Sequence, residues 1–251
     1  MSDVTALVVE NDPTDDICRL GTWLTEAGLG LHVVRPHAGD ELPETLDGYD
    51  ALVVLGGEQD AFPDESGRPG APWFPALESL LRKAVRTKVP TLGICLGGQL
   101  LAQAHGGVVG RATSGPEYGP VLVARRDAAE NDAVWQYVPF MPDVIAWHRD
   151  EILELPRGAT LLAASTRYPI QAFRIGERAW GTQFHFECDA DMIMSWAADT
   201  EGVDAAEIVA EAAAVLDDMA DVWEAFAIRF VAVVRGELST SPGRSLPLLG
   251  H

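Results

Sequence analysis

Short apolar segments alternate with helix-like segments along the first 105 residues. The apolar segments are TALVV (5–9), LHVV (31–34), ALVVL (51–55) and PTLGI (90–94). Stretches with helical periodicity follow three of them, at 17–28, 73–87 and 96–105. Continuous β-branched runs separated by amphipathic helices are typical of a parallel sheet that is covered on both faces. The pattern predicts an α/β fold built on a mostly parallel open sheet.

The pattern changes after about residue 108. Shorter, turn-linked strands are predicted, some of them antiparallel, at VLVARR, DVIAWH, ATLLAAS, IQAFRI and AWGTQFHFE. Beyond residue 190 the chain turns helical, and apolar side chains recur at helical spacing, at Met219, Val222, Trp223, Phe226, Phe230 and Val233. Such a stripe indicates a core-facing helix, with a partner or dimer face as the alternative.

These changes divide the chain into three parts. Residues 1–190 form the main domain, and residues 191–238 form a C-terminal helical extension packed on that domain or at an interface. Residues 239–251, which read STSPGRSLPLLGH from 239 on, are predicted to be a disordered tail.

The composition excludes several classes of protein. The chain has 251 residues and a net charge of −20. No basic stripe is visible in the sequence, so we do not expect the protein to bind nucleic acid or an anionic membrane. Its first residues, MSDVTALVVENDP, lack the pattern of a secretory signal, and no apolar run is long enough to span a bilayer. Three scattered cysteines make no disulfide framework. We expect a cytoplasmic protein.

One of these cysteines lies in the segment GICLG (93–97), between a predicted strand and a predicted helix. The form G-x-C-x-G is that of a nucleophile elbow, in which glycines permit a close approach of strand and helix. The helix beginning near Leu96 would favour the thiolate of Cys95 and would offer a backbone N–H to an oxyanion. A buried structural cysteine is the alternative interpretation.

Two further segments supply complementary groups. If WGTQFHFE (180–187) is a strand, His185 and Glu187 lie on one face of it. Phe184 and Phe186 then lie on the other face. A cysteine, an imidazole and a carboxylate together would form a nucleophile–base–orienter triad. In LGGEQ (55–59), Gly56 or Gly57 could supply a second oxyanion donor. Taken singly, each segment also fits an ordinary strand or turn.

From ALVVLGG through GICLGGQLLAQAHGG to WHRD (147–150), LPRGATLLAAS and WGTQFHFE, the chain resembles the class I, triad-type glutamine amidotransferases. Within them it is similar to the free-standing group that resembles the amidotransferase domain of GMP synthase. The resemblance covers roughly residues 3 to 190 and implies a flavodoxin-like architecture. It implies Cys95 as nucleophile, His185 as general base and acid, and Glu187 as the partner of the histidine.

The resemblance also implies a glutamine pocket. The oxyanion donors would be Gly57 and Leu96, and the substrate-binding residues would be Gly56, Gln99, Glu117, Tyr118 and Gly119. His148 and Asp150 match a recurrent H-x-D element that we expect behind the reacting groups, with a purely structural role left open. Two positions depart from the family, because Phe186 replaces a common proline and Val108 replaces a frequent lysine. Neither change removes a reacting group, and no metal or cofactor is implied.

The predicted function is a glutamine amidohydrolase or amidotransferase that passes through a γ-glutamyl thioester and delivers ammonia to an unknown acceptor. The chain shows no G-x-x-x-x-G-K-[ST] loop and no pyrophosphatase loop, so we expect it to lack the ATP-using half of GMP synthase. A synthetase subunit would then be the partner, docking on loop 57–72 or on the apolar stripe that ends near Val233. A homodimer is left open. The alternatives are a stand-alone γ-glutamyl hydrolase or peptidase and a non-catalytic redox-sensing or binding protein.

Overall fold

The computed structural model describes residues 4–238, so the predicted disordered tail at 239–251 lies outside the described residues. Its centre is an eight-stranded sheet in the order β2-β1-β3-β4-β12-β11-β10-β7. The first five of these strands are parallel: β2 (Leu29–Val34), β1 (Val4–Val9), β3 (Ala51–Val54), β4 (Thr91–Ile94) and β12 (Ala179–Thr182). The other three pair antiparallel: β11 (Ala172–Ile175), β10 (Thr160–Ala164) and β7 (Ala124–Arg125).

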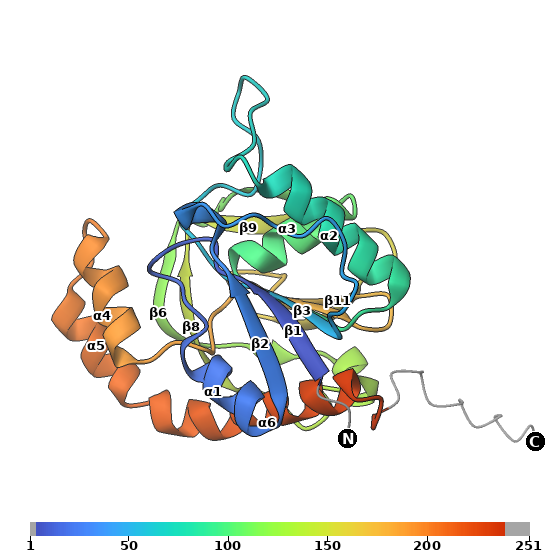
Figure 1. Cartoon of the computed structure of the whole chain (residues 1–251). Helices are drawn as coiled ribbons and strands as arrows, with labels where there is room; N and C mark the ends of the chain where they lie inside the picture. Colours follow the sequence, from blue (N-terminus) through green and yellow to red (C-terminus); the bar gives the residue numbers. More distant parts are fainter. Residues whose placement is uncertain (1–3, 239–251) are drawn as a thin grey trace, which may run out of the picture.

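Helices cover both faces of this sheet (Figure 1). The helices α1 (Cys18–Glu26) and α6 (Leu216–Val234) share one apolar core with Ala6 and Val8 of β1. On the opposite face, α2 (Phe74–Thr87) and α3 (Leu96–Ala104) share a second core with Leu7 and Val9 of the same strand. Alternate residues of a strand point to opposite faces, so a continuous apolar run serves both cores. The predicted mostly parallel, doubly covered sheet is confirmed.

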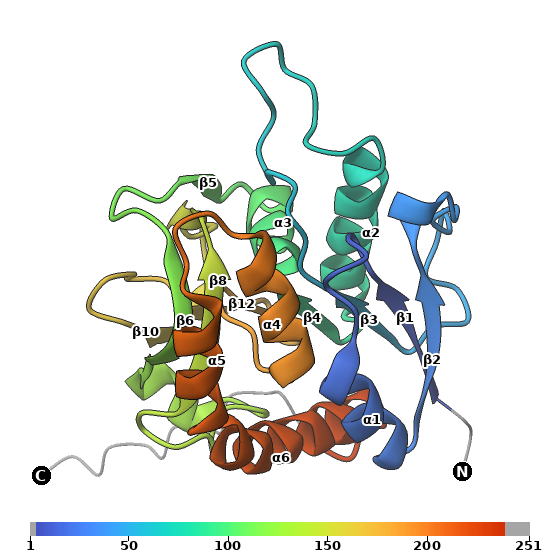
Figure 2. The same ribbon diagram turned by 90° about the vertical axis from the view of Figure 1, so that its left-hand side faces the viewer.

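Two short strand pairs lie beside the main sheet. The strand β5 (Val108–Arg111) pairs with β9 (Asp150–Glu154), and β6 (Glu117–Leu122) pairs with β8 (Asp143–His148), both antiparallel. Short 3-10 turns, η1 (Pro36–Ala38) and η2 (Asp127–Asn131), complete the connections. The helix α5 (Ala205–Ala213) stands next to β6, and α4 (Ala190–Asp199) packs on α5 (Figure 2). These pairs and helices add a second layer of structure around one end of the sheet.

The apolar stripe of α6 is part of the core. Trp223, Phe226 and Phe230 are each at most 1% exposed, and they pack against α1, β8 and the segment after β12. Trp223 also donates a hydrogen bond from Nε1 to the backbone oxygen of Asp143 (3.1 Å). The expectation that this stripe is available to a partner is therefore wrong, because these side chains are already buried within the chain. Within residues 4–238, no helix combines the length and the apolar character needed to cross a membrane.

The long loop between β3 and α2 projects away from the body of the molecule (Figures 1 and 2). Its tip is held by its own contacts, since the Asp64 carboxylate accepts hydrogen bonds from Ser66 and Arg68. These hydrogen bonds lower the pKa of the exposed Asp64 carboxyl to about 2. The loop leaves the carboxyl end of a central strand, the edge at which open α/β sheets place their sites.

Candidate active site

Cys95 lies at the turn between β4 and α3 in a conformation that few residues adopt, with φ 49° and ψ −109°. A Cβ atom on Gly97 would lie 2.0 Å from the backbone oxygen of Val54, and one on Gly93 would lie 2.6 Å from that of Gly97. The turn is therefore tight enough to require glycine on both sides of the cysteine. Backbone strain of this kind persists where the surrounding structure enforces it, which is typical of reactive positions.

His185 and Glu187 contact each other directly. The Nδ1 atom of His185 lies 2.6 Å from Oε1 of Glu187, and both residues are at most 2% exposed. The second carboxylate oxygen, Oε2, accepts a hydrogen bond from the backbone N–H of Phe186 (2.9 Å). Both oxygens of Glu187 are thus occupied, one by the imidazole and one by the backbone.

The backbone that produces this contact differs from the predicted strand. The strand β12 ends at Thr182, so the expectation that residues 180–187 form one strand is wrong. The chain leaves the sheet after Thr182 because His185 exchanges two backbone hydrogen bonds with Ile145 of β8, at 2.7 and 3.0 Å. Phe184 and Phe186 are nonetheless fully buried, as the alternation of side chains predicts.

The charges around His185 favour its protonated form. Burial by itself lowers the pKa of the imidazole, but the Glu187 carboxylate and Cys95 both raise it, by charge and by hydrogen bonding. The pKa of His185 lies well above 6.5 as a result. Because Nδ1 is bound to Glu187, the opposite ring nitrogen, Nε2, is the one available for proton transfer with Cys95. The three predicted triad residues are therefore adjacent in the order that proton transfer requires.

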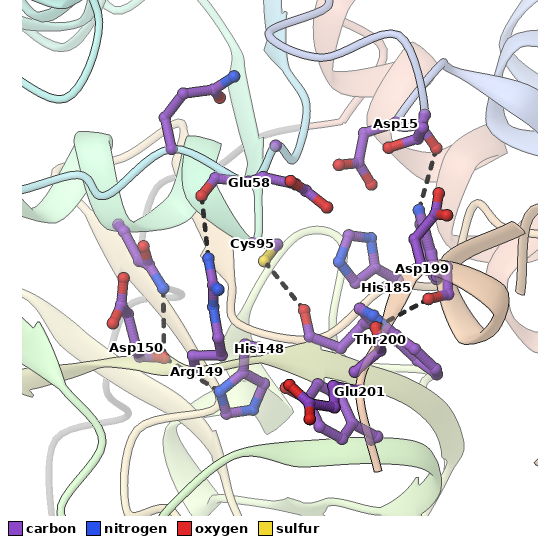
Figure 3. A pocket seen from close by; sticks show the side chains of 17 residues that line it. Asp15, Glu58, Cys95, His148, Arg149, Asp150, His185, Asp199, Thr200 and Glu201 are labelled. Atoms are coloured by element: carbon purple, nitrogen blue, oxygen red, sulfur yellow. Dashed lines mark hydrogen bonds between the residues drawn. The ribbon is translucent and has the colours of Figure 1, made fainter. Parts of the chain in front are cut away.

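These groups open into a cavity of about 420 Å³ (Figure 3). Of the residues predicted from the sequence, seven line it: Gly57, Cys95, Gln99, Tyr118, His148, Asp150 and His185. Glu187 lies behind His185. Gly56 also packs against His185, since a Cβ atom on Gly56 would be 2.9 Å from Cε1 of the imidazole.

Three predicted substrate-binding residues do not line the cavity: Gly56, described above, and Glu117 and Gly119. The carboxylate of Glu117 is hydrogen-bonded to Nε2 of His148 and to Nε2 of Gln171, both at 3.3 Å. Gly119 faces α5, where a Cβ atom would lie 3.7 Å from the side chain of Ile208. Of the PEYG segment, only Tyr118 therefore reaches the cavity with its side chain.

The predicted H-x-D element forms a support for the cavity wall. Nδ1 of His148 lies 3.0 Å from the backbone oxygen of Asp150, and Nε2 of Gln99 donates to the same oxygen (3.3 Å). The Asp150 carboxylate is paired with the guanidinium of Arg111 at 2.7 Å. Burial raises the pKa of Asp150, and Arg111 opposes this increase. These contacts hold Gln99 and His148 in place at the wall.

Several residues at the cavity have no counterpart in the sequence predictions. Gln183 places its amide nitrogen 3.9 Å from the Cys95 sulfur. Trp196 of α4 packs on His185, with ring centroids 4.6 Å apart, and its Nε1 donates to the backbone oxygen of Thr14 (3.0 Å). Asp15 and Arg149 also line the cavity. Gln183 and Arg149 lie inside the quoted segments WGTQFHFE and WHRD, but their spacing gives them no role there, and Asp15 and Trp196 come from distant parts of the chain.

Comparison with known proteins places the chain in a family. The model of the glutamine amidotransferase class-I family matches residues 20–191. Gamma-glutamyl peptidase 4 of Arabidopsis thaliana is 34% identical over 157 residues, which cover 61% of this chain and 60% of that protein. One subunit of the glutamine-hydrolyzing GMP synthase of Saccharolobus solfataricus is 32% identical over 161 residues, covering 64% of this chain and 77% of that protein.

A solved structure of a glutamine amidotransferase from Thermotoga maritima superimposes with a TM-score of 0.81 at 25% identity, covering 92% of this chain and 99% of that one. Since the family model spans more than half of the sequence, the chain belongs to the class I glutamine amidotransferase family. The aligned region spans about three fifths of the length of the Arabidopsis peptidase.

Proposed function

We propose that this protein hydrolyses the side-chain amide of glutamine, with Cys95 as nucleophile, His185 as general base and acid, and Glu187 as the group that orients the imidazole. The observation that supports this assignment most strongly is the buried 2.6 Å hydrogen bond between His185 and Glu187, beside a cavity that Cys95 and His185 line together. A non-catalytic redox sensor or binding protein has no need of that buried pair.

The reaction follows from the positions of these groups. The sulfur of Cys95 attacks the amide carbon, and the C–N bond breaks as the His185 imidazolium gives its proton to the departing ammonia. A γ-glutamyl thioester remains on Cys95. Water then attacks the thioester while His185 accepts a proton from the water, the C–S bond breaks, and the proton returns to the sulfur. Glutamate is released.

The oxyanion formed in each step needs hydrogen-bond donors. Leu96 is the first residue of α3, and the N–H groups in the first turn of a helix have no intrahelical acceptor. Leu96 directly follows Cys95 in the chain, and Gly57 lies at the cavity wall. We assign these two N–H groups to the oxyanion, a contribution of about 10²–10³ in kcat for each donor.

A stand-alone γ-glutamyl hydrolase or peptidase is the second candidate. It is favoured by the cavity, which at about 420 Å³ is also lined by Asp199, the last residue of α4, and by Glu201 just after this helix. It is also favoured by the similarity to proteins named gamma-glutamyl peptidase. Both candidates share the thioester and differ only in the amine that leaves.

The partner depends on which candidate holds. A synthetase that consumes the ammonia fits the similarity to GMP synthase subunits, and loop 57–72 would be its docking surface. A stand-alone hydrolase needs none. A homodimer and a cytoplasmic location stay predictions.

The test is turnover by the purified chain, without a partner, of glutamine and of a series of γ-glutamyl amides. Release of ammonia from glutamine that disappears in Cys95→Ala supports the first candidate. Faster turnover of larger γ-glutamyl amides than of glutamine supports the second. Turnover of neither, with or without synthetases from neighbouring genes, would contradict the proposed function.

A further inference from the structure

Asp15 is a buried carboxylate in the cavity that the proposed reaction does not use. It lies in the loop between β1 and α1 and is 7% exposed. Among residues 4–238, none donates a hydrogen bond to its carboxylate. Its position is fixed by the backbone, because its N–H donates to the backbone oxygen of Asp12, whose side chain accepts from Thr14 and Gln59.

A buried carboxylate without a partner is unfavourable unless it gains a proton or a cation. Burial raises the pKa of Asp15 to about 7; His185 opposes the increase, while nearby carboxylates, Glu187 foremost, add to it. The overall acidity of the chain is enough to explain exposed carboxylates at the mouth of a cavity. It does not explain Asp15, because burying an unpaired carboxylate costs free energy that an exposed, solvated carboxylate does not.

The position of Asp15 relates it to the leaving group. A Cβ atom on Gly56 would lie 2.9 Å from Cε1 of His185 and 3.2 Å from Cγ of Asp15, so both side chains converge on one point of the backbone. In the proposed reaction His185 gives its proton to the departing nitrogen. The leaving amine must therefore lie on the His185 side of Cys95, which is the side of Asp15.

Within the part of the chain that the structure describes, the one arginine that lines the cavity lies on the opposite side of Cys95 from Asp15. Asp15 and Asp199 lie on the same side of Cys95 as His185, whereas Arg149 and Asp150 lie on the other side (Figure 3). Arg149 is the one arginine or lysine among the described residues that line the cavity, and it suits the α-carboxylate of a γ-glutamyl group. The carboxylates on the His185 side have no cation within the described chain to pair with, apart from His185 itself.

We infer that Asp15 is the centre of a subsite for a cationic leaving amine, so that the substrates are γ-glutamyl amides of diamines or polyamines. This inference rests on the proposed thioester chemistry and specifies its second candidate. The amide nitrogen of such a substrate faces His185, and the free ammonium at the far end of the amine binds Asp15. Asp199 lines the cavity on the same side and attracts the same cation. Ammonia from glutamine would leave this subsite empty.

The test compares two substrates that differ in one charge. γ-Glutamyl-4-aminobutylamide ends in an ammonium, and γ-glutamyl-pentylamide replaces that ammonium by a methyl group. The wild-type kcat/KM should favour the cationic amide by about 10- to 100-fold, the range expected for a hydrogen bond between charged groups. In Asp15→Asn the ratio should approach one. Asp221→Asn, which removes a carboxylate exposed on α6, is the matched control and should keep the wild-type ratio.

The outcomes separate this inference from the proposed function. Equal turnover of the two amides by the wild type overturns the subsite and leaves the thioester chemistry intact. Equal loss of both amides in Asp15→Asn also overturns it, because it would mean that Asp15 binds the α-ammonium that the two substrates share. Failure of the wild type to hydrolyse any γ-glutamyl compound, glutamine included, would remove both. The wild-type ratio decides the matter even if Asp15→Asn does not fold.

Discussion

Replacing Glu187 by glutamine removes the charge of the carboxylate while keeping its shape. In the wild type, Oε1 accepts from Nδ1 of His185 and Oε2 accepts from the backbone N–H of Phe186. An amide has one oxygen and one NH₂ group, so it can accept only one of these bonds. The backbone N–H cannot change its role, and we expect the oxygen to stay on it. The NH₂ group then faces Nδ1 and forces the imidazole proton onto Nε2, where it faces Cys95.

The size of the effect follows from these contacts. A hydrogen bond between charged groups contributes about 1.5–3 kcal/mol, which corresponds to roughly 10- to 100-fold in rate. The wrong tautomer adds to this, since the same carboxylate-to-amide change in a serine protease triad costs about 10⁴-fold. We expect kcat to fall by about 10²–10⁴. His185→Ala and Cys95→Ala should fall further, by about 10⁵–10⁶, and their effects should not add.

Two assays check this prediction. Steady-state release of glutamate gives kcat for each variant, with Glu211→Gln on the exposed face of α5 as the matched control. An NMR titration of the His185 ring should give a pKa well above 6.5 in the wild type and a lower pKa in Glu187→Gln, because the raising effect of the carboxylate is lost. An unimpaired His185→Ala enzyme, or an unchanged pKa in Glu187→Gln, would refute the reasoning.

Three further predictions concern stability. Phe186→Ala should lower the free energy of unfolding in urea by about 3–5 kcal/mol, because the ring stacks on Trp223 at 4.6 Å; an unchanged value would contradict this packing. Gly97→Ala should prevent folding or abolish the reactivity of Cys95, and a soluble variant with wild-type activity would show that the turn can relax. The wild type should lose stability as pH rises from about 4 to 7, because folded Asp15, with a pKa raised from 3.8 to about 7, keeps a proton that the unfolded chain has released. Asp15→Asn should remove this slope and be more stable at pH 8, by at most about 4 kcal/mol, as measured by urea unfolding across pH; an unchanged slope would mean that Asp15 is ionised in the folded protein.

The elbow can be predicted from the sequence because its signal is local. Gly93, Cys95 and Gly97 stand at fixed spacing between an apolar run and an amphipathic one, and the tight contacts of the turn account for that spacing. The sequence predicts the pairing of His185 with Glu187 from a strand that in the structure ends before the histidine, at Thr182. The contact forms nonetheless, because a bridge to Ile145 keeps the backbone extended at the histidine.

The rest of the site depends on contacts that no local pattern records. Trp196 reaches His185 from a helix that the sequence pattern assigns to a separate extension, and Phe186, next to the histidine, stacks on Trp223 of α6. Asp15 lies in ENDPTDD, where Glu10, Asp12 and Asp15 are all buried, and nothing in the sequence marks Asp15 as the one that lines the cavity without a hydrogen-bond donor. The PEYG segment predicts Glu117 at the substrate, but pairing of β6 with β8 directs its carboxylate to His148.

The most direct test of the central claim is to locate the residue that a glutamine-like diazoketone modifies. The purified chain is labelled and its peptides are mapped by mass spectrometry. Burial raises the pKa of Cys18 to about 12, with Asp189 adding to the effect, and burial beside Glu187 raises that of Cys188 above its ordinary value, so both should stay unreactive thiols. We expect a single adduct on Cys95 that is absent in Cys95→Ser. An adduct on Cys18 or Cys188, with Cys95 unmodified, would contradict the account.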